Sequence, residues 1–352
     1  MITLKNIHWN VLFYAVATLL VPLAGNSAKK INQDSVPIRQ AKLLWEFKQN
    51  GTINCMDFSP DGSRLVCSSD NSHSNLGIWD TKTGRQLGYV NTYGKIAYSR
   101  YTSDGKTIVT EEIDVDGKGR TDIRIKDGYT GKLKHVIPTD MTDPGWGLAV
   151  SKDSELAAAG DYIDHQPCIR LYDLRTLKEK RVMIFPYELM GIGDIAFSPD
   201  GKLIACPVYS NETGEANLDI WDITTGKRVQ SVGSCYEDIG RYTFFIGSSR
   251  RIISCYMLIN IMQPKNRIRR AVNDIKVIPK ALYTPETNLV LGFVGKPLKM
   301  VEVWDILTQK KVHRWKITDS SVYYKEMAYS QSNRLLALSK DQGSTVKVFS
   351  LD

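Results

Sequence analysis

The sequence lacks the short motifs that mark common metal, cofactor and nucleophile sites. It has only five histidines, and it contains no His-Glu-x-x-His, Cys-x-x-Cys, phosphate-binding loop or Gly-x-Ser-x-Gly turn. The Asp/Gly-rich segment 114–122 is spaced like a calcium loop, but Lys118 stands where an oxygen ligand belongs. We therefore expect a plain hairpin loop there, no metal or cofactor in the protein, and no familiar catalytic site.

Long hydrophobic runs are also missing, apart from one at the N-terminus. Lys5 precedes an apolar run at residues 11–25, and small residues continue to Ala28. A membrane-spanning helix needs about 20 such residues, so the shorter run predicts a signal peptide at 1–28 and a flexible leader at 29–42. The mature chain is then exported to the periplasm or the extracellular space, without a transmembrane domain. An uncleaved membrane anchor is the alternative.

The six cysteines give no sign of a disulfide framework. Cys67 and Cys206 occupy the same position after a turn glycine in two similar segments, and such equivalent positions lie apart in a repeat protein. Small side chains at these positions are typical of a core. We expect buried, free thiols, with a single bridge as the alternative.

What the chain has instead is a repeat of β-strands and turns. An aspartate ends a short strand at Trp79-Asp80, Lys126-Asp127, Tyr172-Asp173, Trp221-Asp222 and Trp304-Asp305. Successive intervals are 47, 46, 49 and 83 residues, so the last interval contains one degenerate unit. A period in the forties with strands in every unit is typical of propeller blades, which bury their faces only by stacking on neighbours.

The clearest unit is 195–232, and it predicts four antiparallel strands. Pro199-Asp200-Gly201 separates the first two strands and Thr225-Gly226-Lys227 the last two. Proline presets φ and glycine accepts positive φ, which suits tight turns. Residues 56–90 follow the same plan, and weaker copies follow along the chain.

The last unit, 327–352, has only three strands, which would leave an open edge. Residues 43–48 have the pattern of an outer strand and are expected to pair with 346–349. We therefore predict an all-β fold: a seven-bladed propeller of four-stranded antiparallel blades over 43–352, closed by this N-terminal strand. Six or eight blades are the alternatives if 242–283 contains a different number of strands.

The Phe-Ser-Pro-Asp-Gly turns and Trp-Asp strand ends resemble the WD-repeat family over essentially the whole mature chain. No Gly-His pair precedes any blade, so the buried His-to-Asp network of many members cannot form. In this the chain is similar to divergent bacterial WD-repeat propellers. The resemblance implies a scaffold function without naming the partner.

Two kinds of connection alternate in such a blade. The turns between first and second and between third and fourth strands are short and uniform, whereas the other connections are long and irregular. Irregular loops on a rigid frame are where recognition is usually found. The expected partner-binding residues are the aromatic side chains of the between-blade loops: Tyr93, Trp146, Tyr187, Tyr236 and Tyr324.

Other conspicuous side chains receive structural interpretations. Trp79, Trp221 and Trp304 alternate with polar neighbours and are expected in the core between blades. The pair Glu111-Glu112 has no sign of a substrate pocket beside it, so we expect it on the solvated surface.

The net charge is +8, and the densest basic stretch contains Lys265, Arg267, Arg269 and Arg270. After export, an anionic envelope polymer is a more suitable partner for it than nucleic acid, and a solvated loop is the alternative. We expect an exported, non-catalytic scaffold that binds a protein partner in the cell envelope. The main alternative is a propeller enzyme or ligand-binding protein using the central channel, favoured if Asp, Glu, Arg or His converge there. An assembly or secretion component with an uncleaved leader is the third.

Overall fold

The computed structural model of the 352-residue chain describes its structure from residue 36 onward. The described ranges are 36–70, 75–92, 95–113, 121–141, 147–163, 166–186, 189–210, 216–233, 243–247, 251–254, 257–260, 282–284, 289–294, 300–305, 308, 310–317, 324–340 and 343–352. All 29 secondary-structure elements in these ranges are β-strands, and they form seven sheets. Nothing helical in the same ranges has the length and apolar character that crossing a membrane requires.

Four consecutive sheets follow one plan, in which strands adjacent in sequence pair antiparallel. Sheet 1 contains β3 (Thr52–Phe58), β4 (Arg64–Asp70), β5 (Asn75–Asp80) and β6 (Gln86–Asn91), and sheet 2 contains β7 (Lys95–Tyr101), β8 (Thr107–Ile113), β9 (Thr121–Asp127) and β10 (Leu133–Met141). Sheet 3 contains β11 (Leu148–Val150), β12 (Leu156–Ile163), β13 (Gln166–Asp173) and β14 (Lys178–Ile184). Sheet 4 contains a divided inner strand, β15 (Leu189–Ile192) and β16 (Ala196–Phe197), followed by β17 (Leu203–Ser210), β18 (Ala216–Asp222) and β19 (Arg228–Gly233). The repeated aspartate ends the third strand each time, as the sequence pattern predicts.

Three further sheets contain the C-terminal strands, and two of them also include an N-terminal strand. Sheet 5 contains β20 (Thr243–Phe245), β21 (Arg251–Ser254) and β22 (Met257–Asn260). Sheet 6 contains β23 (Leu282–Thr284), β24 (Leu289–Val294), β25 (Met300–Asp305) and β26 (Lys310–Lys316), and sheet 7 contains β27 (Tyr324–Ser330), β28 (Leu335–Lys340) and β29 (Thr345–Ser350). The N-terminal β2 (Lys42–Lys48) pairs antiparallel with β29, placing Leu43 opposite Phe349. The shorter β1 (Ile38–Gln40) pairs parallel with β26, so sheet structure begins ahead of the expected boundary at residue 43.

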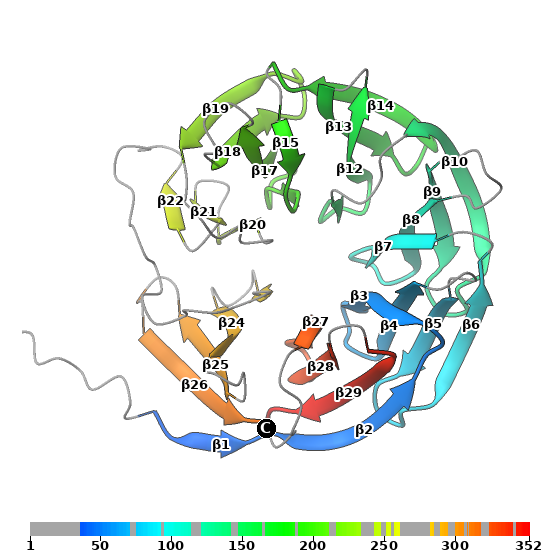
Figure 1. The fold of residues 1–352 in the computed structure, drawn as a ribbon, viewed down its shortest axis with the longest axis vertical. Helices are drawn as coiled ribbons and strands as arrows, with labels where there is room; N and C mark the ends of the chain where they lie inside the picture. The colour runs from blue at the N-terminus through cyan, green and yellow to red at the C-terminus, as the bar shows by residue number, and fades with distance from the viewer. Residues whose placement is uncertain are drawn as a thin grey trace, which may run out of the picture. The chain divides into compact units, whose positions relative to one another are not determined.

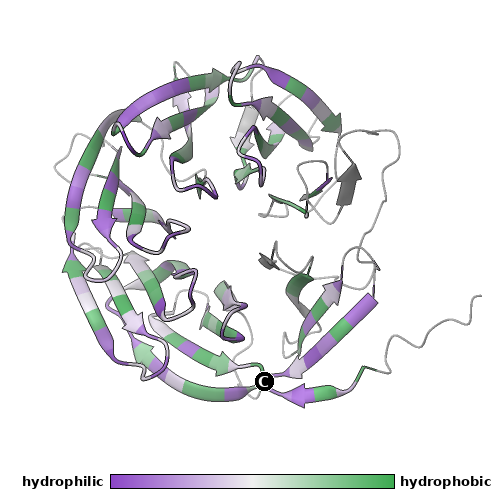
Figure 2. Ribbon diagram, turned by 180° about the vertical axis from the view of Figure 1, so that it is seen from behind, coloured by the Kyte–Doolittle hydropathy of each residue, from purple (hydrophilic) through white to green (hydrophobic). Residues whose placement is uncertain are grey.

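The core lies between neighbouring sheets. Separate hydrophobic clusters join sheets 7 and 1, 1 and 2, 2 and 3, 3 and 4, 4 and 5, and 6 and 7. The inner strands of successive sheets also contact one another, from β27 through β3, β7, β11 and β16 to β20. Figure 1 shows β3, β7, β20 and β27 toward the middle and β6, β10, β14 and β19 on the outside. Along those outer strands hydrophobic and hydrophilic residues alternate, as Figure 2 shows.

The tryptophans of the Trp-Asp pairs lie in these clusters, which confirms their predicted core position. Trp79, Trp221 and Trp304 are at most 9% exposed. Trp79 stacks on Phe47 of β2 with ring centroids 3.7 Å apart, and Trp221 meets Phe185 edge-on at 5.1 Å. Aromatic rings therefore join one sheet to the next.

The cysteines of the described ranges are also in the core. Cys55, Cys67, Cys168 and Cys206 are buried and free. Burial raises the pKa of the Cys67 and Cys206 thiols well above the usual value. Both groups therefore stay protonated and pack as small apolar side chains.

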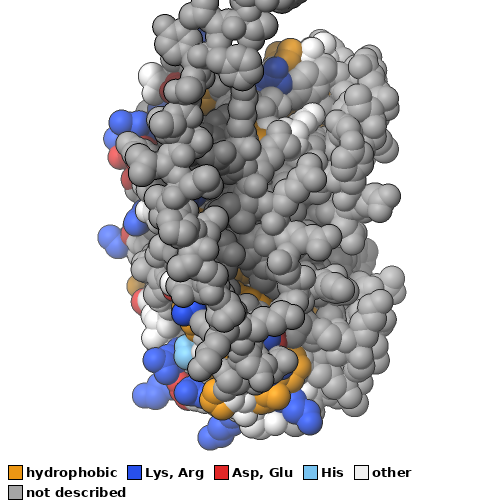
Figure 3. Space-filling model, turned by 90° about the vertical axis from the view of Figure 1, so that its left-hand side faces the viewer, with side chains coloured by type: hydrophobic (Ala, Val, Ile, Leu, Met, Phe, Trp, Pro, Cys, Tyr) orange, Lys and Arg blue, Asp and Glu red, His pale blue; other side chains and the backbone are white. Residues whose placement is uncertain are grey.

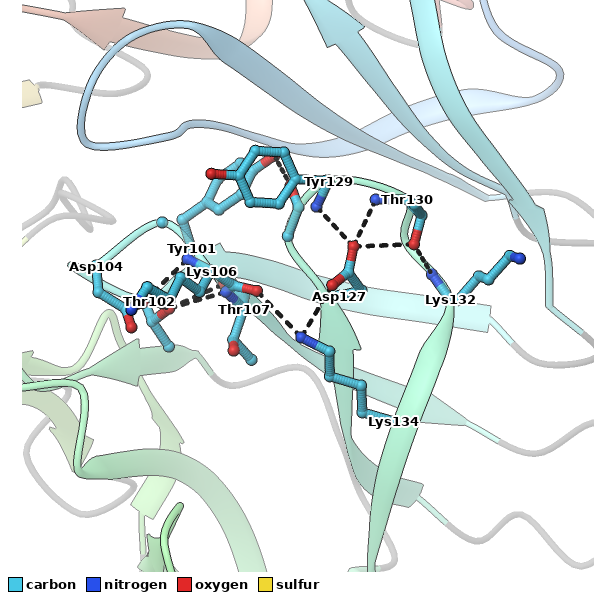
Figure 4. Close-up of polar contacts among 12 residues, drawn as sticks. Tyr101, Thr102, Asp104, Lys106, Thr107, Asp127, Tyr129, Thr130, Lys132 and Lys134 are labelled. Atoms are coloured by element: carbon cyan, nitrogen blue, oxygen red, sulfur yellow. Dashed lines mark hydrogen bonds and ion pairs between the residues drawn. The ribbon is translucent and has the colours of Figure 1, made fainter.

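The short turns are held by the aspartates that end the third strands. In sheet 2 the Asp127 carboxylate accepts hydrogen bonds from the backbone N–H groups of Tyr129 and Thr130 at 3.0 and 2.8 Å (Figure 4). Lys134 forms an ion pair with the same carboxylate at 2.9 Å. The equivalent aspartates of β5, β13, β18 and β25 accept backbone N–H groups from their own turns. The repeated aspartate thus stabilises a tight turn, where no histidine partner is needed.

Most turns use glycine at a position of positive φ. Gly201 and Gly226 both have a φ of 68°. Ser154 stands at the position equivalent to Gly201 and Leu177 at the position equivalent to Gly226, with φ of 63° and 57°, and Arg334 in the turn between β27 and β28 has a φ of 49°. Side chains with a Cβ are strained in this left-handed region. The weaker repeats therefore keep the turn geometry at a cost in backbone energy.

Glu111 and Glu112 are buried in β8, and the expectation of a solvated surface is wrong for both. The Glu112 carboxylate lies 2.9 Å from Lys126 Nζ and 3.0 Å from Arg124 Nη1. Three other buried carboxylates are also paired: Asp161 with Arg170, Glu302 with Lys311, and Asp219 with Arg228, whose own side chain is partly exposed. A sheet covered on both faces has no solvent side for charged residues of its inner strands, so these carboxylates are paired inside it.

Candidate functional site

A cavity of about 780 Å³ lies among the inner strands of the sheets. Its lining comes from six sheets, through residues of β3, β7, β11, β16, β20 and β27. Five residues of the short turns between first and second strands also line it: Pro60, Ser103, Lys152, Ser198 and Pro199. The cavity therefore reaches the side of the sheets where these turns lie.

Neighbouring turns at this end of the cavity are bound to each other. Ser103 donates from its backbone N–H to the Ser154 hydroxyl at 2.9 Å, and its own hydroxyl donates to the Lys152 carbonyl. Arg64 donates to the Gly105 carbonyl at 3.0 Å and stacks over Tyr129 at 3.9 Å. The rim is thus a connected frame, which favours a preformed binding site over one that forms only on contact.

The wall of the cavity carries charged groups beside apolar ones. Arg100 on β7 donates to Cys55 Sγ at 2.6 Å and to the Ser99 carbonyl at 3.0 Å. Burial by itself lowers the pKa of Arg100, but the contact with Cys55 Sγ and the nearby carboxylates of Asp57 and Asp194 outweigh burial and raise it. The guanidinium is therefore permanently charged and lies close to two carboxylates.

Asp57 and Tyr101 belong to this part of the wall, and Tyr98 of the same strand β7 lies behind it, next to Arg100. The Asp57 carboxylate accepts the backbone N–H of Tyr101 at 2.8 Å, which links sheet 1 to sheet 2. Burial raises the pKa of Tyr98, and the nearby carboxylates of Asp194 and Glu111 raise it further. The phenol of Tyr98 is therefore neutral and can only exchange hydrogen bonds.

The repeat shows why Asp57 and Arg100 are unusual. Both stand two residues before the Ser or Thr that precedes the turn, where other units have an alanine that also lines the cavity: Ala149, Ala196 and Ala328. Alignment of the repeats would have revealed this departure as the signal of a charged patch on the channel wall. Sequence reasoning missed both residues because neither belongs to a recognisable motif.

Of the five aromatic residues expected to bind a partner, one lies within the described part of the chain. Tyr93, Trp146, Tyr187 and Tyr236 lie outside the described residues. Tyr324 is in β27, where it is 4% exposed and packs in the cluster between sheets 6 and 7. Its ring stabilises the core, so the expectation of a surface anchor is corrected at this position.

The basic candidates Lys265, Arg267, Arg269 and Arg270 also lie outside the described residues. Within the ranges that are described, no three His, Cys, Asp or Glu side chains are grouped to hold a metal ion. The chemistry the cavity offers is therefore that of Arg100, Asp57, Asp194 and Lys152 beside apolar and aromatic surface: it can receive a group with both charged and apolar parts.

Comparison with known proteins agrees with the repeat pattern. The family model "WD domain, G-beta repeat" matches residues 41–80. The chain is 25% identical over 185 residues to the "U3 small nucleolar RNA-associated protein 18 homolog" of Mus musculus, a match that spans 51% of this chain and 30% of that protein. Among solved structures it is similar to "Kuenenia stuttgartiensis Hydrazine Synthase", with a TM-score of 0.67, 15% identity, and coverage of 86% of this chain and 96% of that one. At this identity the structural likeness concerns the fold alone.

Proposed function

We propose that this member of the WD-repeat β-propeller family is a non-catalytic scaffold that binds a protein partner. The observation that carries the proposal is the cavity of about 780 Å³ formed jointly by six sheets. Its rim combines turns that are fixed to each other with a mixed charged and apolar wall. A segment of a partner protein can contact both kinds of surface there.

The frame behind this site is proposed to be a closed ring of seven blades. Seven sheets are present in the described residues, and the N-terminal β2 adds to β29 of the last sheet. In a ring, each sheet packs between two neighbours, which keeps the rim residues at fixed positions. Such a frame suits binding without a large conformational change.

The place of action is proposed to be the cell envelope, after export. The support is the sequence pattern of a signal peptide at 1–28. Mass spectrometry of the protein from its native cell gives the test. A chain starting near Lys29 supports export with cleavage, a chain starting at Met1 in the envelope supports an anchored component, and a chain in the cytoplasm contradicts the proposal.

The scaffold is tested by crosslinking the tagged protein in the fraction where it is found and identifying the crosslinked positions. The proposal expects one reproducible protein partner, with crosslinks at the cavity rim. Lys152→Glu changes the charge of an exposed lining residue and should reduce capture about tenfold. Lys82→Glu, the matched control, makes the same change at an exposed turn residue that does not line the cavity.

Two outcomes would redirect this proposal. Equal capture by Lys152→Glu and wild type, with loss in a Trp146→Ala, Tyr236→Ala double variant, would move the interface to the between-blade loops. If neither the wild type nor any variant captured a protein partner, the scaffold function would be contradicted.

A second candidate function is supported by the charged groups on the channel wall. The convergence of Arg100, Asp57 and Asp194 favours a small ligand with charged groups, or a reaction in the channel, over an inert apolar pore. Thermal-shift screening against charged small molecules tests it. A stabilising ligand whose effect is lost in Asp194→Asn would favour this function, and a screen without such a ligand would count against it.

The basic stretch at Lys265, Arg267, Arg269 and Arg270 is proposed as a contact for an anionic envelope polymer. Replacing the three arginines with serine should weaken binding of a polymeric anion and flatten its dependence on salt. Unchanged binding with unchanged salt dependence would remove this role.

A further inference from the structure

We propose that an outer strip of the protein, formed by β1, β2 and β26, binds the surface of a membrane containing anionic lipids. The strip consists of Ile38–Gln40, Lys42–Lys48 and Lys310–Lys316. It lies on the outside of sheets 6 and 7, away from the cavity. Its function is therefore independent of the partner proposed for the rim.

The three strands are joined into one surface. β1 pairs with β26 so that Ile38 lies beside Arg314 and Gln40 beside Lys316. Ala41, which connects β1 to β2, is buried and donates its N–H to the Lys316 carbonyl at 3.1 Å. A single N-terminal segment therefore runs along the outer edges of two sheets. The side chains of β1, β2 and β26 thus belong to one continuous surface.

Charge on the strip is strongly one-sided. Its basic residues are Arg39, Lys42, Lys48, Lys310, Lys311, Arg314 and Lys316, and Glu46 is its one acidic residue. Glu302 of β25 pairs with Lys311 and Arg314. The exposed Arg39, Lys42 and Lys316 take part in no ion pair within the described ranges. The strip thus presents unneutralised positive charge to solvent.

Burial and nearby positive charge lower the pKa of His313, which lies within the strip. Burial lowers the pKa of its imidazole, and the neighbouring Arg39 and Arg334 lower it further. Figure 3, which looks onto the left-hand side of Figure 1, shows Lys and Arg side chains beside hydrophobic ones at the lower edge, where β1 and β26 lie in Figure 1.

Exposed apolar side chains among the cations favour an anionic membrane over a soluble polyanion as the partner. Ile38, Leu43 and Leu44 are 56%, 46% and 39% exposed. A break in register between Leu43 and Trp45 where β2 meets β29 explains why two consecutive leucines both face solvent. Contact with such side chains adds no binding free energy for a soluble polyanion. In a bilayer, the apolar side chains are buried at the interface and the anionic head groups attract the cations.

The test measures binding of the purified full-length protein to vesicles by flotation, with phosphatidylcholine alone or with added phosphatidylglycerol. The cation variant is Arg39→Ser, Lys42→Ser, Lys316→Ser. Its matched control, Lys178→Ser, Lys180→Ser, Lys227→Ser, removes the same charge from exposed residues at the edges of sheets 3 and 4. Every protein keeps the same N-terminal leader, so the contribution of the leader cancels.

The expected result is a loss of affinity for anionic vesicles on the order of 100-fold in the cation variant, because each cation near such a surface contributes about a fivefold factor. The control variant should bind like wild type. Leu43→Ser with Leu44→Ser should lose about tenfold, while Ile184→Ser with Val229→Ser, two exposed apolar residues elsewhere on the outer strands, should not. Equal melting temperatures identify variants that are folded and comparable.

Three results would overturn the proposal. Equal binding of wild type to neutral and anionic vesicles would show that charge is not used. Equal losses in the cation variant and its control would show that only net charge matters. Binding to soluble polyphosphate as tight as to vesicles, with no effect of the leucine changes, would assign the strip to a polymeric anion.

Discussion

The cavity wall and the outer strip both contain arginine and lysine, but the cations of the two surfaces differ in their interaction partners. On the wall, Arg100 donates to Cys55 and lies close to Asp57 and Asp194. On the strip, Arg39 and Lys316 are exposed and have no ion-pair partner within the described residues. The wall therefore uses its charges to connect sheets, and the strip leaves its charges free for a partner outside the molecule.

The difference follows from how many faces of a strand are covered. An inner strand has another sheet on each side, so a charge there must be paired or lose a large amount of solvation energy. An outer strand has water on its free side and can keep a cation hydrated at almost no cost. The same repeated β-strand thus gives two kinds of charged surface.

The largest effect is expected from breaking an interior pair. Glu112→Ala leaves Lys126, which is 2% exposed, without its carboxylate, and should lower the free energy of unfolding by about 3–5 kcal/mol. Glu46→Ala on the strip, whose carboxylate is 3.7 Å from Lys347, should cost less than about 1 kcal/mol. Urea unfolding of both variants measures the contrast. Similar values for the two would mean that charges inside the sheets and charges on the strip do not differ in this way.

A smaller effect is expected on the cavity wall. Arg100→Met removes a charged hydrogen-bond donor and should lower the free energy of unfolding by about 2 kcal/mol. Lys316→Met makes a comparable change on the strip and should stay within about 0.5 kcal/mol of wild type. Thermal and urea unfolding check both. An unchanged free energy of unfolding in Arg100→Met would show that the interactions of the wall charges add no more stability than those of the strip.

A third change separates the backbone from the charge. Arg334→Gly removes an exposed cation but relieves a φ of 49°, so it should raise the free energy of unfolding by about 0.5 kcal/mol. Gly201→Ala, where an added Cβ meets nothing closer than 3.9 Å, should lower it by about 1 kcal/mol through its φ of 68° alone. Destabilisation by Arg334→Gly, with Arg334→Lys neutral, would show that the exposed charge matters more than the turn.

The smallest effect is expected at one turn aspartate under changing pH. Hydrogen bonds from Thr225 hold the pKa of Asp222 below its usual value of 3.8. A carboxyl group with a lowered folded-state pKa stabilises the fold above the unfolded value and loses this contribution as the pH falls through the folded value. Asp222→Asn should therefore lower the melting temperature slightly at pH 7 and less at acid pH. An equal change in melting temperature at both pH values would exclude the ionised carboxylate as the cause.

Much of the fold was predictable because the repeat is local. The Pro-Asp-Gly and Thr-Gly-Lys turns fix hairpins within each unit, and the Trp-Asp pairs mark the third strands, which the sheets confirm. The pairing of 43–48 with 346–349 was also predictable, since a three-stranded last unit needs one more strand. The parallel β1 was not, because a three-residue strand held mainly by backbone hydrogen bonds leaves no side-chain pattern.

The candidate site was less predictable than the fold. Sequence reasoning looked to aromatic residues in irregular loops, and Tyr324, which can be described, is in the core. The charged wall of the cavity, with Asp57 and Arg100, depends on inner strands from different units meeting around one space. That meeting brings together residues separated by about a blade length or more, and no local motif records it.

The sequence by itself determined the strands of the clear repeats, their turns and the tryptophans that join neighbouring sheets, since short-range turn chemistry and hydrophobic alternation act within one repeat. Only the tertiary structure decided which charges are paired and which stay free, because solvation depends on what covers each strand. Glu111 and Glu112 look like surface residues in the sequence and are buried, whereas the apolar Leu43 and Leu44 face solvent. Burial is a property of the packed sheets, and it separates a structural charge from one that is available for binding.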